Sequence, residues 1–83
     1  MAYEQYSKVA LKVDLPPHRL RRGDVAIVVD SRPARPGQEP GYYLEVFNAV
    51  GESIAVLMVD ESQIKPLTQN EILHARRLDE APS

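Results

Sequence analysis

A glycine-aspartate turn that runs into five consecutive apolar residues constrains the fold more than any other stretch of this chain. Gly23 and Asp24 open directly into residues 25–29, of which three are valine and one is isoleucine. The run is too short for a membrane span, and its β-branched side chains disfavour a helix. Since both faces of the run are apolar, the sequence predicts a central strand of a buried sheet.

Four further short strands are predicted from apolar stretches that end at proline, glycine or polar residues. They cover residues 8–13, 42–47, 53–59 and 64–67. Within the second of these, alternation places Tyr42, Leu44 and Val46 toward the core. Glu45 then points to solvent. The third stretch is apolar on both faces, and Leu20 is expected to tuck under the sheet.

The connections between these strands follow from their turn residues. Gly51 predicts a tight turn over residues 48–51, and the polar run 60–63 predicts a single 3₁₀ turn. Residues 31–41 hold three prolines and two glycines and show no periodicity. This stretch therefore predicts a long exposed loop, and such loops often carry binding residues.

A helix is predicted after the last strand, because Thr68 and Glu71 form a capping box ahead of an apolar stripe. The whole pattern predicts a mainly β protein, a small SH3-like barrel of about five short antiparallel strands with a C-terminal α-helix. An OB-type barrel fits less well, because the chain leaves no room for the additional helix of that fold. The expected parts are a flexible or edge-lying lead-in (1–7), the barrel (8–67), the helix (68–78) and a tail (79–83).

Length and composition narrow the class of protein further. A chain of 83 residues is expected to form one domain. It contains no cysteine, which excludes disulfides, thiolate zinc sites and cysteine nucleophiles. The N-terminal sequence lacks the basic and apolar regions of a signal peptide, and no apolar run approaches the roughly 20 residues of a spanning helix. A soluble cytoplasmic protein is therefore expected.

The charge of the chain is unevenly distributed. Residues 8–35 carry seven basic and three acidic groups, a net charge of +4, whereas the remaining residues carry −6. Such an asymmetry is typical of a basic face for nucleic acid or an acidic partner, and equally of solvated loops that keep a small barrel soluble. The arginines that would form a binding surface are Arg19, Arg21, Arg22, Arg32 and Arg35.

Aromatic and helical residues complete the candidate surface. Tyr43 and Phe47 point away from the core, where they either stack on bases or, as a purely structural pair, close the sheet or meet the terminal helix. Ile72 and Leu78 lie on the apolar stripe of the predicted helix. That stripe is expected to cover an opening of the barrel or a second subunit.

The sequence offers no pattern for catalysis or metal binding. Its two histidines, His18 and His74, lack ligand spacing, and its serines lie in turn-like contexts. The four glycines form no phosphate-binding loop. Residues 22–24 spell a cell-adhesion tripeptide, which a turn explains in a chain expected inside the cell. No enzymatic activity, cofactor or metal is therefore expected.

Two functions of different classes remain. The first is a non-catalytic interaction module or accessory subunit that binds a protein partner, in a hetero-complex or a homo-oligomer, through strand edges, the 31–41 loop or the helix. The second is RNA or DNA binding by the arginines, which predicts an affinity that falls steeply with salt. The net charge of −2 weighs against the second function. No contact with a membrane is expected.

The order of these features resembles a family of small bacterial proteins known only as domain of unknown function 4926. The resemblance rests on residues 9–16, 20–30, 43–52 and 55–66. Its main motif is a leucine, two spacers, Gly-Asp and a valine-rich strand, which several SH3-like families share, including the KOW modules. Ala26 stands where the family often has glycine, and the 31–41 loop is longer than expected. The resemblance implies a small partner-binding unit, antitoxin- or immunity-like in some cases, with no known activity.

Overall fold

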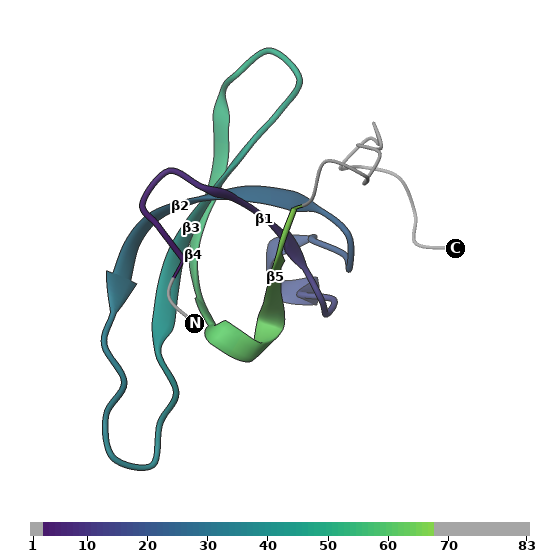
Figure 1. Cartoon of the computed structure of the whole chain (residues 1–83). Helices are drawn as coiled ribbons and strands as arrows, with labels where there is room; N and C mark the ends of the chain where they lie inside the picture. Colours follow the sequence, from purple (N-terminus) through teal and green to yellow (C-terminus); the bar gives the residue numbers. More distant parts are fainter. Residues whose placement is uncertain (1–2, 68–83) are drawn as a thin grey trace.

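Five antiparallel strands form a single sheet in the computed structural model of the chain, which describes residues 3–67. In chain order the strands are β1 (Lys8–Leu11), β2 (Val25–Arg32), β3 (Gly41–Phe47), β4 (Ser53–Asp60) and β5 (Ile64–Pro66). Their order in space is β4-β3-β2-β1-β5, so the strand that follows the glycine-aspartate turn occupies the middle (Figure 1). The predictions of a mainly β fold and of a central β2 are confirmed.

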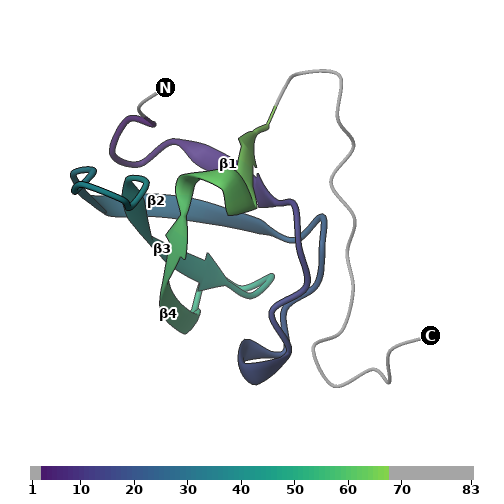
Figure 2. The ribbon, with the colours of Figure 1, turned by 90° about the horizontal axis from the view of Figure 1, so that it is seen from below.

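The sheet is rolled rather than flat. β4 and β5 stand at opposite ends of the strand order, yet only the 3₁₀ turn η2 (Glu61–Gln63) joins them. Across a flat sheet of five strands the two edges would lie about 19 Å apart. The four peptide steps from Asp60 to Ile64 span at most about 14 Å. The ends of the sheet must therefore curve toward each other, as both views show (Figures 1 and 2).

The described helical segments are single 3₁₀ turns. η1 (Pro16–His18) follows β1 and begins with a proline. The first N–H of a helical turn has no partner within the turn, so proline causes no loss of a hydrogen bond there. η2 confirms the turn predicted for the polar run before the last strand. Within residues 3–67 no helix is long and apolar enough to cross a membrane. The helix predicted for residues 68–78, with Ile72 and Leu78, lies outside the described residues.

The core fills the interior of the rolled sheet. β3 directs alternate side chains inward, as predicted, because successive residues of a strand point to opposite faces. Leu20 is buried beneath the sheet, which also agrees with the sequence. The buried apolar cluster consists of Val9, Leu11, Leu20, Ala26, Val28, Tyr42, Leu44, Val46, Leu57, Val59 and Ile64.

β1 is shorter than the sequence predicts. It ends at Leu11, and Val13, which was expected to share the inward face, is 36 % exposed. The Asp14 carboxylate accepts a hydrogen bond from the backbone N–H of Arg22 at 2.9 Å, which draws the chain into the loop between β1 and β2. The alternation of apolar residues carries no signal for this bond, because its two partners are eight residues apart.

β2 is longer than predicted, and the loop expected over residues 31–41 is partly strand. A register shift in the middle of β2 lets the chain resume its pairing with β3 as far as Arg32. The remaining residues, 33–40, form a hairpin that a bridge between Arg35 and Gln38 closes. The prolines of this stretch led the sequence analysis to expect a loop, although they lie outside the paired positions of β2 and β3.

The lead-in before β1 lies along the sheet. The backbone N–H of Val28 donates to the carbonyl oxygen of Ser7 at 3.0 Å, and the N–H of Tyr6 donates back to the carbonyl oxygen of Val28. The side-chain amide of Gln5 donates to the carbonyl oxygen of Val29 at 3.0 Å. Residues 3–7 therefore continue the path of β1 alongside β2.

Asn48 organises the hairpin between β3 and β4. Its side-chain oxygen accepts hydrogen bonds from the backbone N–H groups of Val50 (3.1 Å) and Glu52 (2.9 Å). Its side-chain amide donates to the Glu52 carboxylate at 2.9 Å. Gly51, with a φ of 87°, adopts the left-handed conformation that this turn requires and that glycine tolerates best.

Asn48→Ala is expected to lower the free energy of unfolding by about 1–2 kcal/mol, because two backbone donors of the hairpin lose their acceptor. Urea denaturation followed by circular dichroism measures the loss. Val50→Ala serves as the control, because this side chain is 79 % exposed in the same turn. An Asn48→Ala variant as stable as the control would show that the side-chain bonds do not hold the hairpin.

Candidate functional site

An exposed apolar patch covers the outer face of β3 and β4. In both strands, alternate side chains fill the core, and the intervening ones point away from it. Tyr43 lies opposite Met58 across the two strands, and Val56 lies opposite Glu45. The members of this outer patch are Tyr43 and Phe47 from β3 and Ile54, Val56 and Met58 from β4, each between 39 % and 60 % exposed.

The sequence predicts two members of the outer patch but not the other three. Alternation in β3 predicts that Tyr43 and Phe47 point away from the core, and the structure agrees. The 53–59 stretch is apolar on both faces in the sequence, but nothing in the sequence marks its outer side chains as a surface. The missing information was the strand order, which places β4 at the end of the described sheet with β3 as its neighbour.

Acidic side chains surround the outer patch. Glu45 lies within it and is half-buried between the apolar side chains. Asp30 of β2 pairs with Tyr43, and Asp60 ends β4. Glu52 stands at the other end of β4, next to the hairpin. The rim also includes one positive charge, because the Arg32 guanidinium lies 3.8 Å from the Met58 sulfur. The patch therefore offers an apolar centre and a mostly acidic rim, which suits a partner with basic side chains at its margin.

The five candidate arginines do not form one surface. Arg19, Arg21 and Arg22 precede β2, whereas Arg32 and Arg35 lie at its end and in the following hairpin. Because β2 has eight residues, and therefore seven steps of about 3.3 Å, its two ends are about 23 Å apart. The structure thus divides the basic half of the chain between two ends of the sheet.

Acidic residues accompany the arginines that precede β2. The Asp24 carboxylate accepts a hydrogen bond from the backbone N–H of Arg21 at 2.8 Å, and Asp14 binds the N–H of Arg22. Arg19 adopts a left-handed conformation, with a φ of 57°, at the end of η1. These bonds shape the loop through its backbone and place two negative charges among three positive ones.

Arg32 lies beside the outer patch, where its guanidinium is 3.8 Å from the Met58 sulfur. Its guanidinium lies over Gly41, where an added Cβ atom would come within 2.9 Å of it. One terminal nitrogen of the guanidinium lies 3.8 Å from the Asp60 carboxylate and 3.4 Å from the carbonyl oxygen of Glu39. Because Gly41 has no side chain, the Arg32 guanidinium can lie over it and pair with Asp60, which links the end of β2 to the end of β4.

A buried tyrosine network closes the interior near the N-terminal lead-in. The Tyr42 hydroxyl donates to the Glu61 carboxylate at 3.0 Å and accepts from the backbone N–H of Tyr3 at 3.1 Å. The two tyrosine rings meet edge to face at 5.2 Å. Burial raises the pKa of both phenols above the ordinary value of 10.0, and the Glu61 charge adds to the rise. Both groups are therefore held neutral as structural hydrogen-bonding groups.

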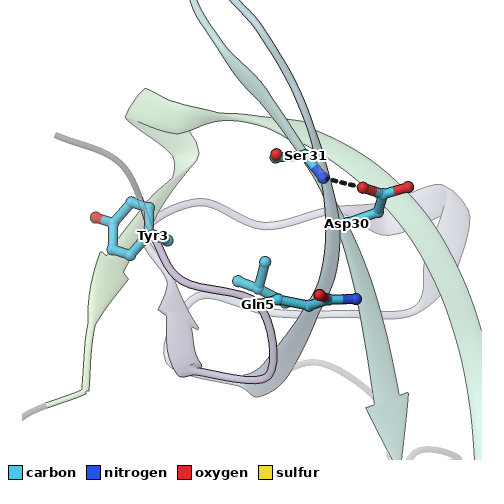
Figure 3. A pocket seen from close by; sticks show the side chains of 5 residues that line it. Tyr3, Gln5, Asp30 and Ser31 are labelled. Carbon is cyan, nitrogen blue, oxygen red and sulfur yellow. Dashed lines mark hydrogen bonds between the residues drawn. The ribbon is translucent and has the colours of Figure 1, made fainter.

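A small pocket adjoins this network. It has a volume of about 80 Å³ and is lined by Tyr3, Gln5, Val28, Asp30 and Ser31 (Figure 3). Asp30 accepts a hydrogen bond from the backbone N–H of Ser31 at 2.8 Å, so its carboxylate is engaged locally. Pockets that bind small organic ligands usually measure about 300–1,000 Å³. This one is too small to hold a molecule of that size.

Metal-ligating side chains are scattered in the described part of the chain. No group of three or more histidine, cysteine, aspartate or glutamate residues comes together there in a way that could hold an ion. His18, the histidine within residues 3–67, is exposed at the end of η1. The outer patch is therefore the feature of this region with the clearest capacity for recognition.

Comparison with known proteins identifies a family and no activity. A family model described as a domain of unknown function (DUF4926) matches residues 5–66. Neither a curated protein nor a solved structure shows significant similarity to the chain. The matched segment contains all five strands and both 3₁₀ turns, and it also contains every residue of the outer patch.

Proposed function

The chain belongs to the DUF4926 family, and we propose that the protein is a non-catalytic interaction module that binds a protein partner through its outer patch. The observation that carries the proposal is the patch itself. Five large apolar side chains stand exposed on two adjacent strands of a small domain. A contiguous exposed apolar area with a polar rim is typical of a protein interface.

The charge around the patch indicates the chemistry of the partner. Glu45 lies among the apolar side chains and Asp30 flanks them, and Asp60 flanks them as a pair with Arg32. A partner surface with an apolar centre and lysine or arginine at its margin would complement this arrangement, and opposite charges at a rim favour encounter. Tyr43 and Phe47 are suitable anchors, because aromatic side chains often dominate the binding energy of interfaces.

We also assign the rolled sheet to the SH3-like barrels. The assignment is supported by five short antiparallel strands, a hairpin between β3 and β4, and a 3₁₀ turn immediately before the last strand. Barrels of this kind host many unrelated functions, so the fold alone indicates no activity. The argument for binding rests on the outer patch.

Nucleic-acid binding has weaker support from the placement of the arginines. Contacts with phosphates are strongest when basic side chains gather on one face. Here the three arginines that precede β2 stand among two aspartates, and Arg32 lies against Asp60 and Gly41. A nucleic-acid complex is therefore an outcome of the test below rather than a second proposal.

The proposal is tested by affinity capture from native extract with the full chain, a Tyr43→Ser/Phe47→Ser variant and a Tyr6→Ser control. We expect a partner at stoichiometric amounts with the wild type and the control, and a loss of at least about tenfold with the double variant. Tyr6 is a matched control because its ring is 70 % exposed and it belongs to the lead-in before β1 rather than to β3 or β4. Circular dichroism verifies that each variant is folded.

Two results would contradict the proposal. One is the capture of the same partner by the wild type and the double variant in equal amounts. The other is binding to mixed-sequence RNA or duplex DNA that falls steeply between about 50 mM and 200 mM salt and is lost when Arg19, Arg21 and Arg22 are replaced by glutamine. The second result would show that the protein binds nucleic acid through the loop before β2.

A further inference from the structure

The free edge of β4 is a separate feature from the outer patch. β4 pairs with β3 on one side, and among residues 3–67 it has no strand on the other. Its eight residues contain no proline and no lysine, and they carry no charge before Asp60. Proteins commonly protect an exposed edge with such residues or with a bulge, because an unprotected edge pairs readily with another strand. The register of β4 shifts at Ile54, so its regular part begins at Ala55.

The hydrogen bonds of the sheet show which residues of β4 face this edge. Val28 exchanges its backbone bonds with residues 6 and 7, on the β1 side of β2. The backbone N–H and C=O groups of successive residues point to opposite sides of a strand, so those of Ile27 point toward β3 and bond with the backbone of Glu45. By the same alternation, the backbone groups of Leu44 point toward β4 and bond with the backbone of Leu57. The residues on either side of Leu57 therefore direct their N–H and C=O groups to the free edge.

Val56 and Met58 therefore face the free edge, and their side chains also belong to the outer patch, whereas Ile54 lies at a register shift and has no partner in β3. An antiparallel copy of the same strand matches them when Val56 lies on the two-fold axis. Val56 of each copy then faces Val56 of the other, and Met58 lies beside the irregular position Ile54, so apolar side chains meet at the centre. Val56 and Met58 each offer a donor and an acceptor to the facing strand.

The charges near β4 permit this arrangement. With β4 strands paired, the two copies of Glu45 are three strand spacings apart, about 14 Å, which exceeds the screening length of about 8 Å at physiological ionic strength. At the ends of the pair, Glu52 of one copy approaches Asp60 of the other. Each of these carboxylates already has a partner, since Glu52 binds the Asn48 amide and Asp60 lies beside Arg32.

We infer that the free edge of β4 pairs antiparallel with β4 of a second copy of this chain, with Val56 on the two-fold axis. The pairing joins two five-stranded sheets into one and places their outer patches side by side. The contact is small, because a strand edge buries less area than a standard interface, so the dimer is weak and depends on concentration. It uses the backbone of β4, whereas the proposed partner binds the side chains of the outer patch.

Sedimentation velocity of the full chain between about 10 µM and 1 mM tests the inference over the range expected for a weak dimer. We expect a reversible monomer–dimer equilibrium. Val56→Pro should raise the dissociation constant at least about tenfold, since it removes an N–H that faces the edge, and proline is tolerated in edge strands. Val56→Thr keeps the N–H and the branched shape and should stay within about threefold of the wild type.

Single-cysteine variants supply a second measurement that does not depend on the proline variant. The chain has no cysteine of its own, so Val56→Cys introduces one thiol on the proposed axis, where paired strands bring Cα atoms within disulfide range. Val50→Cys is the control, because that position is more exposed but lies off the edge. Under mild oxidation we expect Val56→Cys to form a covalent dimer at least about tenfold faster.

The outcomes separate this inference from the proposed function. A monomer at every concentration, or a dimer that Val56→Pro leaves intact, overturns the pairing of β4. Faster cross-linking of Val50→Cys than of Val56→Cys overturns it as well. Loss of partner capture with Tyr43→Ser/Phe47→Ser concerns the outer patch alone, because neither residue contributes backbone groups to the free edge.

Discussion

Leu44→Ala is expected to lower the free energy of unfolding by about 3 kcal/mol, within the range of about 2–5 kcal/mol typical of such truncations. Leu44 is fully buried at the centre of β3, which has β2 on one side and β4 on the other. Removing its side-chain carbons leaves a cavity in the core. Side chains from several strands line this core, so the rolled sheet cannot easily collapse around the cavity. A domain of this size has a stability of only a few kcal/mol, so the variant should be largely unfolded at 37 °C.

Urea denaturation followed by circular dichroism measures this loss as a lower transition midpoint. Val50→Ala is the matched control, since it removes a smaller apolar group from a side chain that is 79 % exposed, and it should change stability by less than about 0.5 kcal/mol. A loss below about 1 kcal/mol for Leu44→Ala would show that the core is not centred on β3.

Tyr42→Phe is expected to lower the free energy of unfolding by about 1–3 kcal/mol near neutral pH. The substitution keeps the buried ring and removes only the hydroxyl, so the backbone N–H of Tyr3 loses its acceptor and the Glu61 carboxylate loses a donor. A buried group left without its hydrogen-bond partner accounts for a cost of this size. Urea denaturation at neutral pH measures the effect.

The same residue predicts how stability depends on alkaline pH. Burial raises the pKa of Tyr42 above its ordinary value of 10.0, so the folded state favours the neutral phenol more than the unfolded state does. The resulting stabilisation is complete below pH 10 and is lost as the pH rises through the pKa of the folded state. The free energy of unfolding of the wild type should therefore fall more steeply above pH 10 than that of Tyr42→Phe.

Tyr6→Phe is the control for the alkaline experiment, because the ring of Tyr6 is 70 % exposed. It should follow the wild type at each pH. Tyr3 also has a raised pKa, so Tyr42→Phe should retain part of the alkaline loss, and a Tyr3→Phe/Tyr42→Phe variant should retain less. Equal slopes for the wild type and Tyr42→Phe would show that this phenol does not govern alkaline stability.

The inward face of β3 could be predicted from the sequence because it depends on local alternation. Tyr42, Leu44 and Val46 recur at every second residue, and a strand with that pattern has one inward face. The end of β1 could not be predicted in the same way. Val13 continues the alternation, but β1 ends at Leu11, and the next residues belong to a loop in which Asp14 binds the backbone N–H of Arg22, eight residues away.

The candidate site required knowledge of the strand order. The stretch with Ile54, Val56 and Met58 is apolar on both faces, and the sequence alone could not distinguish a strand buried on both sides from an edge strand with an exposed face. The arginines posed the same difficulty. They are close together in the sequence, but the length of β2 separates them in space.

The pairing of β1 with β5 has a consequence for how the chain folds. Val9 lies opposite Pro66, so the two ends of the matched segment meet in adjacent strands. Bringing such distant residues together costs about 3.5 kcal/mol of chain entropy before any contact compensates for it. We expect the β2–β3 and β3–β4 hairpins to form early and the pairing of β1 with β5 to form last. During synthesis the sheet cannot close until its final strand has emerged from the ribosome, and until then β1 has one strand neighbour instead of two.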